Sequence, residues 1–105
     1  MMESVARETI LQEMNDSLTR IMNKYGVDDI GIFEEQGEGQ EYYIGYTIRK
    51  ADDVFMVHRP FYKNEQGLLA LHEKKWTVEF EDGEDIHGFS SFDEAMDNVS
   101  NGIKH

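Results

Sequence analysis

The residues best suited to chemistry lie in a short acidic stretch in the last third of the chain. Glu81, Asp82, Glu84 and Asp85 fall within one short span, and His87 follows two positions later. Clustered carboxylate oxygens bind calcium or magnesium, and an imidazole near a reactive group is suited to act as a general base. These residues define the metal-binding or catalytic hypothesis for this sequence.

The same stretch also has a purely structural interpretation. Asp82-Gly83 predicts a tight hairpin turn, because a type I′ turn needs positive φ at both central positions. The ligand spacing of an EF-hand loop is absent. Ser91 and Glu94 form the S-x-x-E pattern that caps the start of a helix. We therefore favour a hairpin that leads into a helix over a metal site, and we expect no cofactor.

The elements that must position these residues can be predicted from hydrophobic periodicity. Over residues 4–25 apolar side chains recur at steps of three and four, which predicts a helix that ends at Gly26. Strand-like alternation follows, most clearly over residues 42–49 and 54–63. Residues 68–72 favour a short strand, with a short helix near 65–74 as the alternative. A second amphipathic helix begins near residue 92.

Together these elements predict one α+β domain over residues 1–105. It has an N-terminal helix, an antiparallel meander sheet of five to six strands and a C-terminal helix, arranged in two layers. A chain of 105 residues is long enough to bury one hydrophobic core without disulfides or structural metals.

The two central strands are apolar on both faces, which predicts an interaction surface. We assign one face to Tyr42, Ile44, Tyr46 and Ile48, and the opposite, partner-binding face to Tyr43, Phe55, Val57 and Phe61. Two helices on one side would leave the second face open, and large exposed apolar patches usually mark interaction sites. The alternative is a sheet that curls, or one helix on each face, which would leave nothing open.

The charge balance restricts the class of partner. The formal net charge is −12, which opposes direct binding to nucleic acids and to anionic membrane surfaces. The sequence contains no cysteine, so it has neither disulfides nor thiolate chemistry. No apolar run is long enough to span a membrane, and the start "MMESVARETI" lacks the apolar region of a secretory signal. We expect a cytoplasmic protein.

From these features we expect a non-enzymatic protein-interaction or regulatory domain that binds a protein partner or itself, for example as a homodimer. One alternative is a domain that binds a small molecule or a divalent metal. Another is an acidic decoy that occupies the nucleic-acid site of a basic protein, because its charge mimics a phosphate backbone.

Three stretches carry a resemblance to known sequences: "EYYIGYTIRK", "VFMVHRPFYKNEQG" and "WTVEF…GFSSFDEAM". Together they resemble a family of small uncharacterised acidic proteins from Bacillus-type bacteria. The resemblance covers most of the chain and implies a bacterial cytosolic setting. It implies no activity and no site residues.

Overall fold

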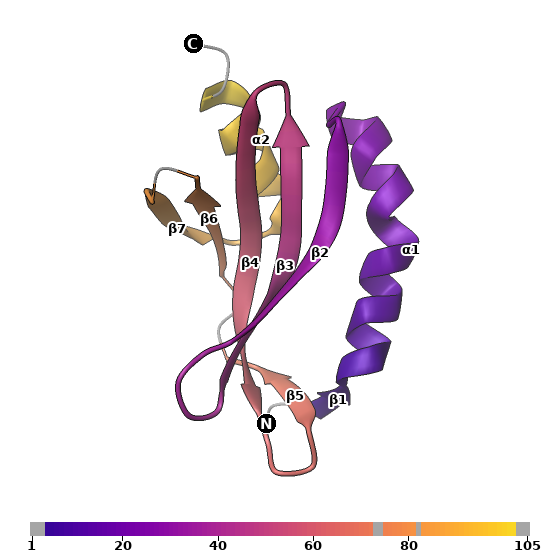
Figure 1. Ribbon diagram of the computed structural model, residues 1–105, viewed down its shortest axis with the longest axis vertical. Helices are drawn as coiled ribbons and strands as arrows, with labels where there is room; N and C mark the ends of the chain where they lie inside the picture. The colour runs from indigo at the N-terminus through magenta and orange to yellow at the C-terminus, as the bar shows by residue number, and fades with distance from the viewer. Residues whose placement is uncertain (1–3, 73–74, 82, 103–105) are drawn as a thin grey trace.

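The computed structural model describes residues 4–72, 75–81 and 83–102. Within them, two helices and seven strands follow one another along the chain (Figure 1). Their bounds are β1 Ser4–Ala6, α1 Arg7–Tyr25, β2 Asp29–Gln36, β3 Glu41–Lys50, β4 Asp53–Lys63, β5 Leu68–Leu71, β6 Trp76–Phe80, β7 Asp85–Phe89 and α2 Phe92–Gly102. The predicted α+β class, with a helix at each end of an antiparallel sheet, is confirmed.

The ends of the helices follow the sequence signals, with one difference at the start. Residues 4–6 form the strand β1, so α1 begins at Arg7 and not at residue 4. This strand raises the described sheet above the expected five to six strands. At the other end of α1, Gly26 adopts φ 62° and its N–H donates to the Met22 carbonyl at 2.9 Å. This is the predicted left-handed cap.

The start of α2 also agrees with the sequence. The Glu94 N–H donates to Ser91 Oγ at 3.0 Å, as an N-cap requires. The Glu94 carboxylate in turn accepts hydrogen bonds from the backbone N–H and the hydroxyl of Ser90. The predicted strand at residues 68–72 is present as β5, so the helical alternative for this segment is wrong.

The sheet has the order β1-β5-β4-β3-β2 and forks beside β4. Residues 55–58 of β4 pair with β6, residues 61–63 pair with β5, and β7 continues the sheet from β6. Pro60 lies at the fork, where its carbonyl accepts the His72 N–H at 3.1 Å. A proline has no N–H to donate, and a point where a strand changes partner tolerates that loss.

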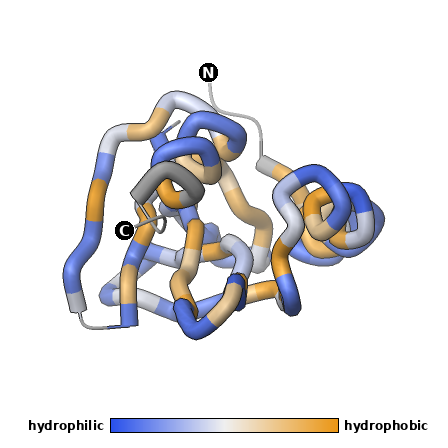
Figure 2. Tube along the Cα trace, turned by 90° about the horizontal axis from the view of Figure 1, so that it is seen from above, coloured by the Kyte–Doolittle hydropathy of each residue, from blue (hydrophilic) through white to orange (hydrophobic). Residues whose placement is uncertain are grey.

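Both helices pack on the same side of the sheet, which we call the helix-facing side. Seen from above, α1 and α2 lie apart from each other (Figure 2). The core consists of sheet side chains that alternate toward this side, with contributions from both helices. It contains Ile21, Val27, Tyr42, Ile44, Tyr46, Ile48, Phe55, Val57, Phe61, Leu69, Val78, Phe89, Ala95, Met96 and Val99.

The predicted partner-binding face is wrong for three of its four residues. Phe55, Val57 and Phe61 are 1%, 0% and 5% exposed and belong to the core. The register explains why: Phe55 lies opposite Ile48, and Phe61 lies opposite Tyr42, so these side chains share the helix-facing side. Of the four, Tyr43 alone points to the other side, which we call the outer face.

Among the described residues, no helix is long and apolar enough to cross a membrane.

Candidate functional site

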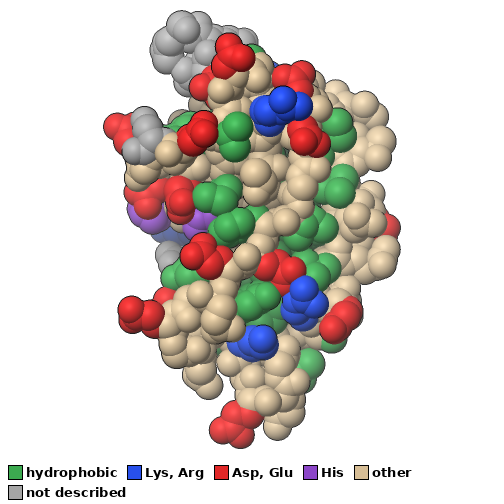
Figure 3. Space-filling model, in the orientation of Figure 1, with side chains coloured by type: hydrophobic (Ala, Val, Ile, Leu, Met, Phe, Trp, Pro, Cys, Tyr) green, Lys and Arg blue, Asp and Glu red, His purple; other side chains and the backbone are tan. Residues whose placement is uncertain are grey.

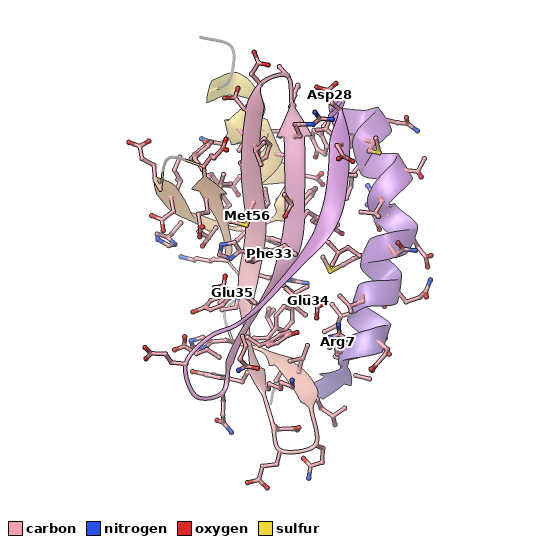
Figure 4. The ribbon with its side chains drawn as sticks, viewed as in Figure 1. Arg7, Asp28, Phe33, Glu34, Glu35 and Met56 are labelled. Atoms are coloured by element: carbon pink, nitrogen blue, oxygen red, sulfur yellow. The ribbon has the colours of Figure 1, made fainter. Side chains whose placement is uncertain are left out.

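The N-terminal end of α1 is held against the sheet by a charged contact. Arg7 donates from Nε and Nη2 to the two carboxylate oxygens of Glu34 on β2, at 2.5 and 2.8 Å. The Tyr42 hydroxyl donates to the same carboxylate at 2.7 Å. Figure 4 shows Arg7 and Glu34 pointing toward each other across the space between α1 and β2. The hydrogen bonds from Arg7 lower the pKa of Glu34 below its ordinary value.

The C-terminal end of α1 is held by a second contact, this time to α2. Lys24 Nζ donates to Asp93 Oδ1 at 3.0 Å, and the Tyr25 hydroxyl donates to the same oxygen. These donors lower the pKa of Asp93, with the Tyr25 hydroxyl as the larger cause. Lys50 Nζ also donates to the Tyr25 carbonyl at 3.1 Å. We call the Arg7–Glu34 and Lys24–Asp93 contacts the two clamps of α1.

An open groove of about 1,090 Å³ lies between α1 and the sheet. Its floor is formed by β3, β4 and β5, and one wall is the side of α1 that carries Ile10, Met14 and Ser17. Of all described α1 residues, Ile21 alone is buried. Ile10, Met14 and Ile21 of the predicted apolar stripe line the groove. Its other members, Leu11, Leu18, Met22 and Tyr25, pack against the core, so the stripe is shared between the core and the groove.

Aromatic rings form one end of the groove. Trp76 at the start of β6 and Tyr46 on β3 both meet the ring of Phe92 on α2 edge to face, with centroid distances of 5.4 and 5.1 Å. The Arg59 guanidinium lies over the Trp76 ring, 4.6 Å from its centroid, and 5.5 Å from the centroid of Phe61. A cation over an aromatic face is stabilised by the ring quadrupole.

Arg59 brings a charge into this apolar setting without a carboxylate partner. Arg59 belongs to β4 and lies opposite Ile44 of β3, on the helix-facing side. Its side chain is half-buried. Burial lowers the pKa of Arg59, although a guanidinium stays protonated in proteins. Over the described part of the chain, no carboxylate comes within 4.0 Å of an Arg59 nitrogen.

Two further polar groups face the same space. Arg20 on α1 lines the groove, and the charges of Arg20 and Arg59 both act on the Tyr46 phenol. Burial raises the pKa of Tyr46, and the two arginine charges oppose that rise. Tyr46 is 6% exposed, yet its hydroxyl forms no hydrogen bond with any residue that the structure describes. Glu13 is the acidic residue of the groove lining, and it is exposed.

The outer face of the sheet is organised around His58. Its ring packs between Phe33 and Tyr43, with centroid distances of 5.6 and 5.8 Å. A Cβ on Gly45 would lie 2.4 Å from the His58 Cα and 2.0 Å from the Val57 carbonyl oxygen, so only glycine fits beneath the histidine. Phe33 and Met56 point away from the helices (Figure 4). Figure 3 looks onto this face and shows hydrophobic side chains over its middle with acidic ones around them.

The His58 side chain is largely shielded from solvent, and one of its ring nitrogens has no hydrogen-bond partner. Its side chain is 12% exposed, Nε2 lies 3.5 Å from Glu79 Oε1, and Nδ1 is buried without a hydrogen-bond partner. Burial lowers the pKa of His58, and the Glu79 carboxylate opposes that shift. The ring is therefore held mainly as a neutral packing group. A hollow of about 250 Å³ lies beside it.

The described residues of the acidic stretch singled out in the sequence make local contacts. His87 Nδ1 pairs with the Thr77 hydroxyl at 2.9 Å, and its Nε2 lies 3.4 Å from Asp85 Oδ2. Glu81 and Glu84 line a separate shallow hollow. In residues 4–72, 75–81 and 83–102, no group of three or more His, Asp or Glu side chains is placed to hold a metal ion. Asp82 lies outside the described residues.

Sequence reasoning missed the groove residues Arg59, Arg20, Tyr46 and Trp76. One signal for Arg59 was available: it occupies an odd position of β4, like Phe55, Val57 and Phe61, and is the charged residue in that apolar series. A lone charge on a core-facing series is unusual enough to indicate a functional position.

Comparison with known proteins gives a family and no activity. No curated protein matches the chain. A model described as a family of unknown function (DUF5634) matches residues 4–99, which is nearly the whole chain. The protein therefore belongs to the family of unknown function DUF5634.

Proposed function

We propose that this protein is a non-enzymatic binding domain whose site is the groove between α1 and the sheet, and that the groove takes an elongated, mainly apolar small molecule. The observation that carries the proposal is that α1 is clamped at both ends, while part of its apolar side, including Ile10 and Met14, lines an open groove of about 1,090 Å³. Ligand pockets are typically concave, mostly apolar and about 300–1,000 Å³ in size.

The energetics of the groove favour an occupant. Ile10 and Met14 on the wall stay partly exposed, and Val5 at 38% is one of the large apolar side chains that water reaches. Each further 100 Å² of apolar surface removed from water stabilises a complex by about 2.5 kcal/mol before the costs of association. A ligand that covers this wall therefore gains affinity without displacing any element of the fold.

The test uses the one tryptophan of the chain as a reporter. Trp76 lines the groove, so an occupant should change its fluorescence. We expect the uncharged dye Nile red to bind the full chain, with a rise in dye emission and a change in Trp76 emission. Ser17→Phe should fill the groove and abolish both signals, because Ser17 lies on the wall and its hydroxyl bonds only locally, to the Glu13 carbonyl at 3.0 Å.

Ser17→Ala is the matched control, because it loses the same hydroxyl but leaves the groove open. It should bind Nile red like the unmodified protein. Absence of dye binding to the unmodified protein would contradict the proposal. So would binding that survives Ser17→Phe and is lost in Tyr43→Ala, since the dye would then lie on the outer face.

Self-association through the outer face is a second candidate function. Phe33, Tyr43 and Met56 surround His58 on a face that no described helix covers (Figure 1). The occupant we infer is a second copy of the chain, in line with the homodimer expected from the sequence. Light scattering at high micromolar concentration tests it: a dimer that Tyr43→Ala dissociates supports this candidate, and a strict monomer rejects it.

The setting that we propose is the cytoplasm of a Bacillus-type bacterium, on the basis of the sequence resemblance. The acidic surface would keep such a protein soluble, because like charges on different copies repel each other.

A further inference from the structure

The groove has a charged end that its apolar lining does not explain. Arg59, Arg20 and Tyr46 all line the groove, and the two guanidinium charges act on the Tyr46 phenol. Arg20 is exposed, and its charge acts on Asp93 as well. All three groups are hydrogen-bond donors. None of the three has a carboxylate or other acceptor for its side chain among the residues that the structure describes. This region is complementary to an anion.

We propose that the groove binds a long-chain carboxylate, with its apolar chain along α1 and its head group at Arg59. The inference rests on the proposed function, because it assumes that the groove is the binding site. A guanidinium presents two parallel N–H donors that match the two oxygens of a carboxylate. The Tyr46 hydroxyl is placed to contribute a further donor.

The charge of the lining favours a monoanion. Two arginines and one glutamate, Glu13, line the groove and together leave one positive charge there. The whole chain, in contrast, carries −12. A carboxylate balances the local charge, whereas a dianionic phosphate would leave a surplus negative charge in a partly apolar site. His72 also lines the groove, at its exposed margin.

Arg59 is already oriented for this role. The Trp76 ring supports its guanidinium at 4.6 Å, so the side chain needs little further ordering when a ligand arrives. A donor that is fixed before binding loses less conformational entropy in the complex. Stacking over a ring face also leaves the edges of the planar guanidinium, where its N–H groups lie, available for a ligand.

The experiment compares ligands that share one chain length and differ in head group. Dodecanoate, methyl dodecanoate and dodecyltrimethylammonium are titrated into the full chain at pH 8, below their micelle concentrations. Trp76 fluorescence and calorimetry report binding. Because a charge-assisted contact is stronger than a neutral one, dodecanoate should bind at least about tenfold more tightly than the methyl ester and the ammonium compound.

Variants assign the head-group site. Arg59→Gln should weaken dodecanoate binding at least about tenfold and leave the affinity for the methyl ester within about twofold. Arg49→Gln is the matched control, since it removes one arginine charge at an exposed position of β3 that does not line the groove. This control should leave all three affinities unchanged.

The outcomes separate the inference from the proposed function. Equal binding of the carboxylate and the ester, unaffected by Arg59→Gln, would overturn the inference and leave the groove as an apolar site. A carboxylate preference that survives Arg59→Gln would overturn the assignment to Arg59. Failure of all three compounds and of Nile red to bind would overturn both the inference and the proposed function.

Discussion

Two neighbouring residues of β4, His58 and Arg59, carry basic side chains to opposite faces of the sheet. Burial lowers the pKa of both groups. An imidazole whose pKa is lowered is neutral at pH 7, whereas a guanidinium stays charged. The outer face therefore packs around a neutral ring, and the groove retains a permanent positive charge.

The difference between His58 and Arg59 shows under which conditions a buried basic group indicates a ligand-binding site. His58 is enclosed by Phe33 and Tyr43 and sits over Gly45, so packing explains its burial. Arg59 borders an open space and stacks on Trp76 without a carboxylate among the described residues. A buried imidazole can lose its proton and then needs no charged partner. A buried guanidinium keeps its charge and is stabilised when a ligand supplies the opposite charge.

The largest expected effect comes from disrupting the packing of the outer face. Gly45→Ala should lower the free energy of unfolding by about 3 kcal/mol, because its Cβ would overlap the Val57 carbonyl and the His58 backbone. Gly31→Ala is the control, because Gly31 lies on β2, on the same outer face of the sheet, and nothing lies within 4 Å of a new Cβ. This substitution should change the free energy of unfolding by less than about 1 kcal/mol. Urea unfolding measures both, and equal effects would show that the face is not tightly packed.

Acid should open the wall of the groove locally. The clamps lower the pKa values of Glu34 and Asp93 from ordinary values of 4.5 and 3.8. For carboxylates with lowered folded pKa values, the stabilisation is present above those ordinary values and is lost as pH falls through the folded ones. Amide hydrogen exchange in α1 should therefore accelerate relative to β3 as the pH falls below 4.5, and not between pH 6 and pH 4.5.

Glu34→Gln provides the internal check on the clamps. It removes the first clamp at every pH, so exchange near Arg7 should already be fast at pH 6, while exchange near Lys24 keeps its pH dependence. Uniform acceleration across α1 and β3 on acidification would contradict local opening.

A smaller effect of pH on stability is expected from His58 on the outer face. Its folded pKa is lowered from 6.5, so the unfolded chain takes up the proton first as the pH falls. The stabilisation due to the neutral ring is therefore full above pH 6.5 and is lost as pH falls through the folded pKa. His58→Phe should flatten the fall in thermal midpoint between pH 7 and pH 5. A fall in thermal midpoint that His58→Phe leaves unchanged would contradict this prediction.

The smallest expected change in stability distinguishes a ligand-binding arginine from a structural one. Arg59→Met should leave the free energy of unfolding within about 1 kcal/mol or raise it, because it exchanges an unpaired charge for an apolar side chain at the cost of the ring contact. Arg7→Met should lower the thermal midpoint, because it breaks the first clamp. A loss at Arg59 larger than that at Arg7 would identify Arg59 as structural.

Local patterns predicted the elements well but assigned one face wrongly. Alternation shows which residues of one strand share a side, and it leaves the phase between two strands open. The missing information was the length of the hairpin loop. Lys50 pairs with Asp53 across the two residues Ala51 and Asp52, so even-numbered residues of β3 pair with odd-numbered residues of β4. That parity moves Phe55, Val57 and Phe61 into the core.

The groove itself lay beyond local patterns. The lateral position of α1 depends on contacts between residues that are far apart in the sequence: Arg7 and Glu34 are 27 positions apart, and Lys24 and Asp93 are 69 apart. The amphipathic pattern of α1 predicted that its apolar side would face the sheet. It could not predict that the helix would be held at both ends and would leave an open groove along part of its apolar side.

The pairing of β1 with β5 has a consequence for how the chain reaches this structure. Ser4 lies opposite Ala70, whereas β2, β3 and β4 are joined by consecutive hairpins. Short-range hairpins form early, since closing a long loop costs more chain entropy before any contact repays it. We therefore expect the hairpins to nucleate folding and the N-terminal strand to dock late, so that the groove, which Val5 helps to line, is completed in one of the last steps.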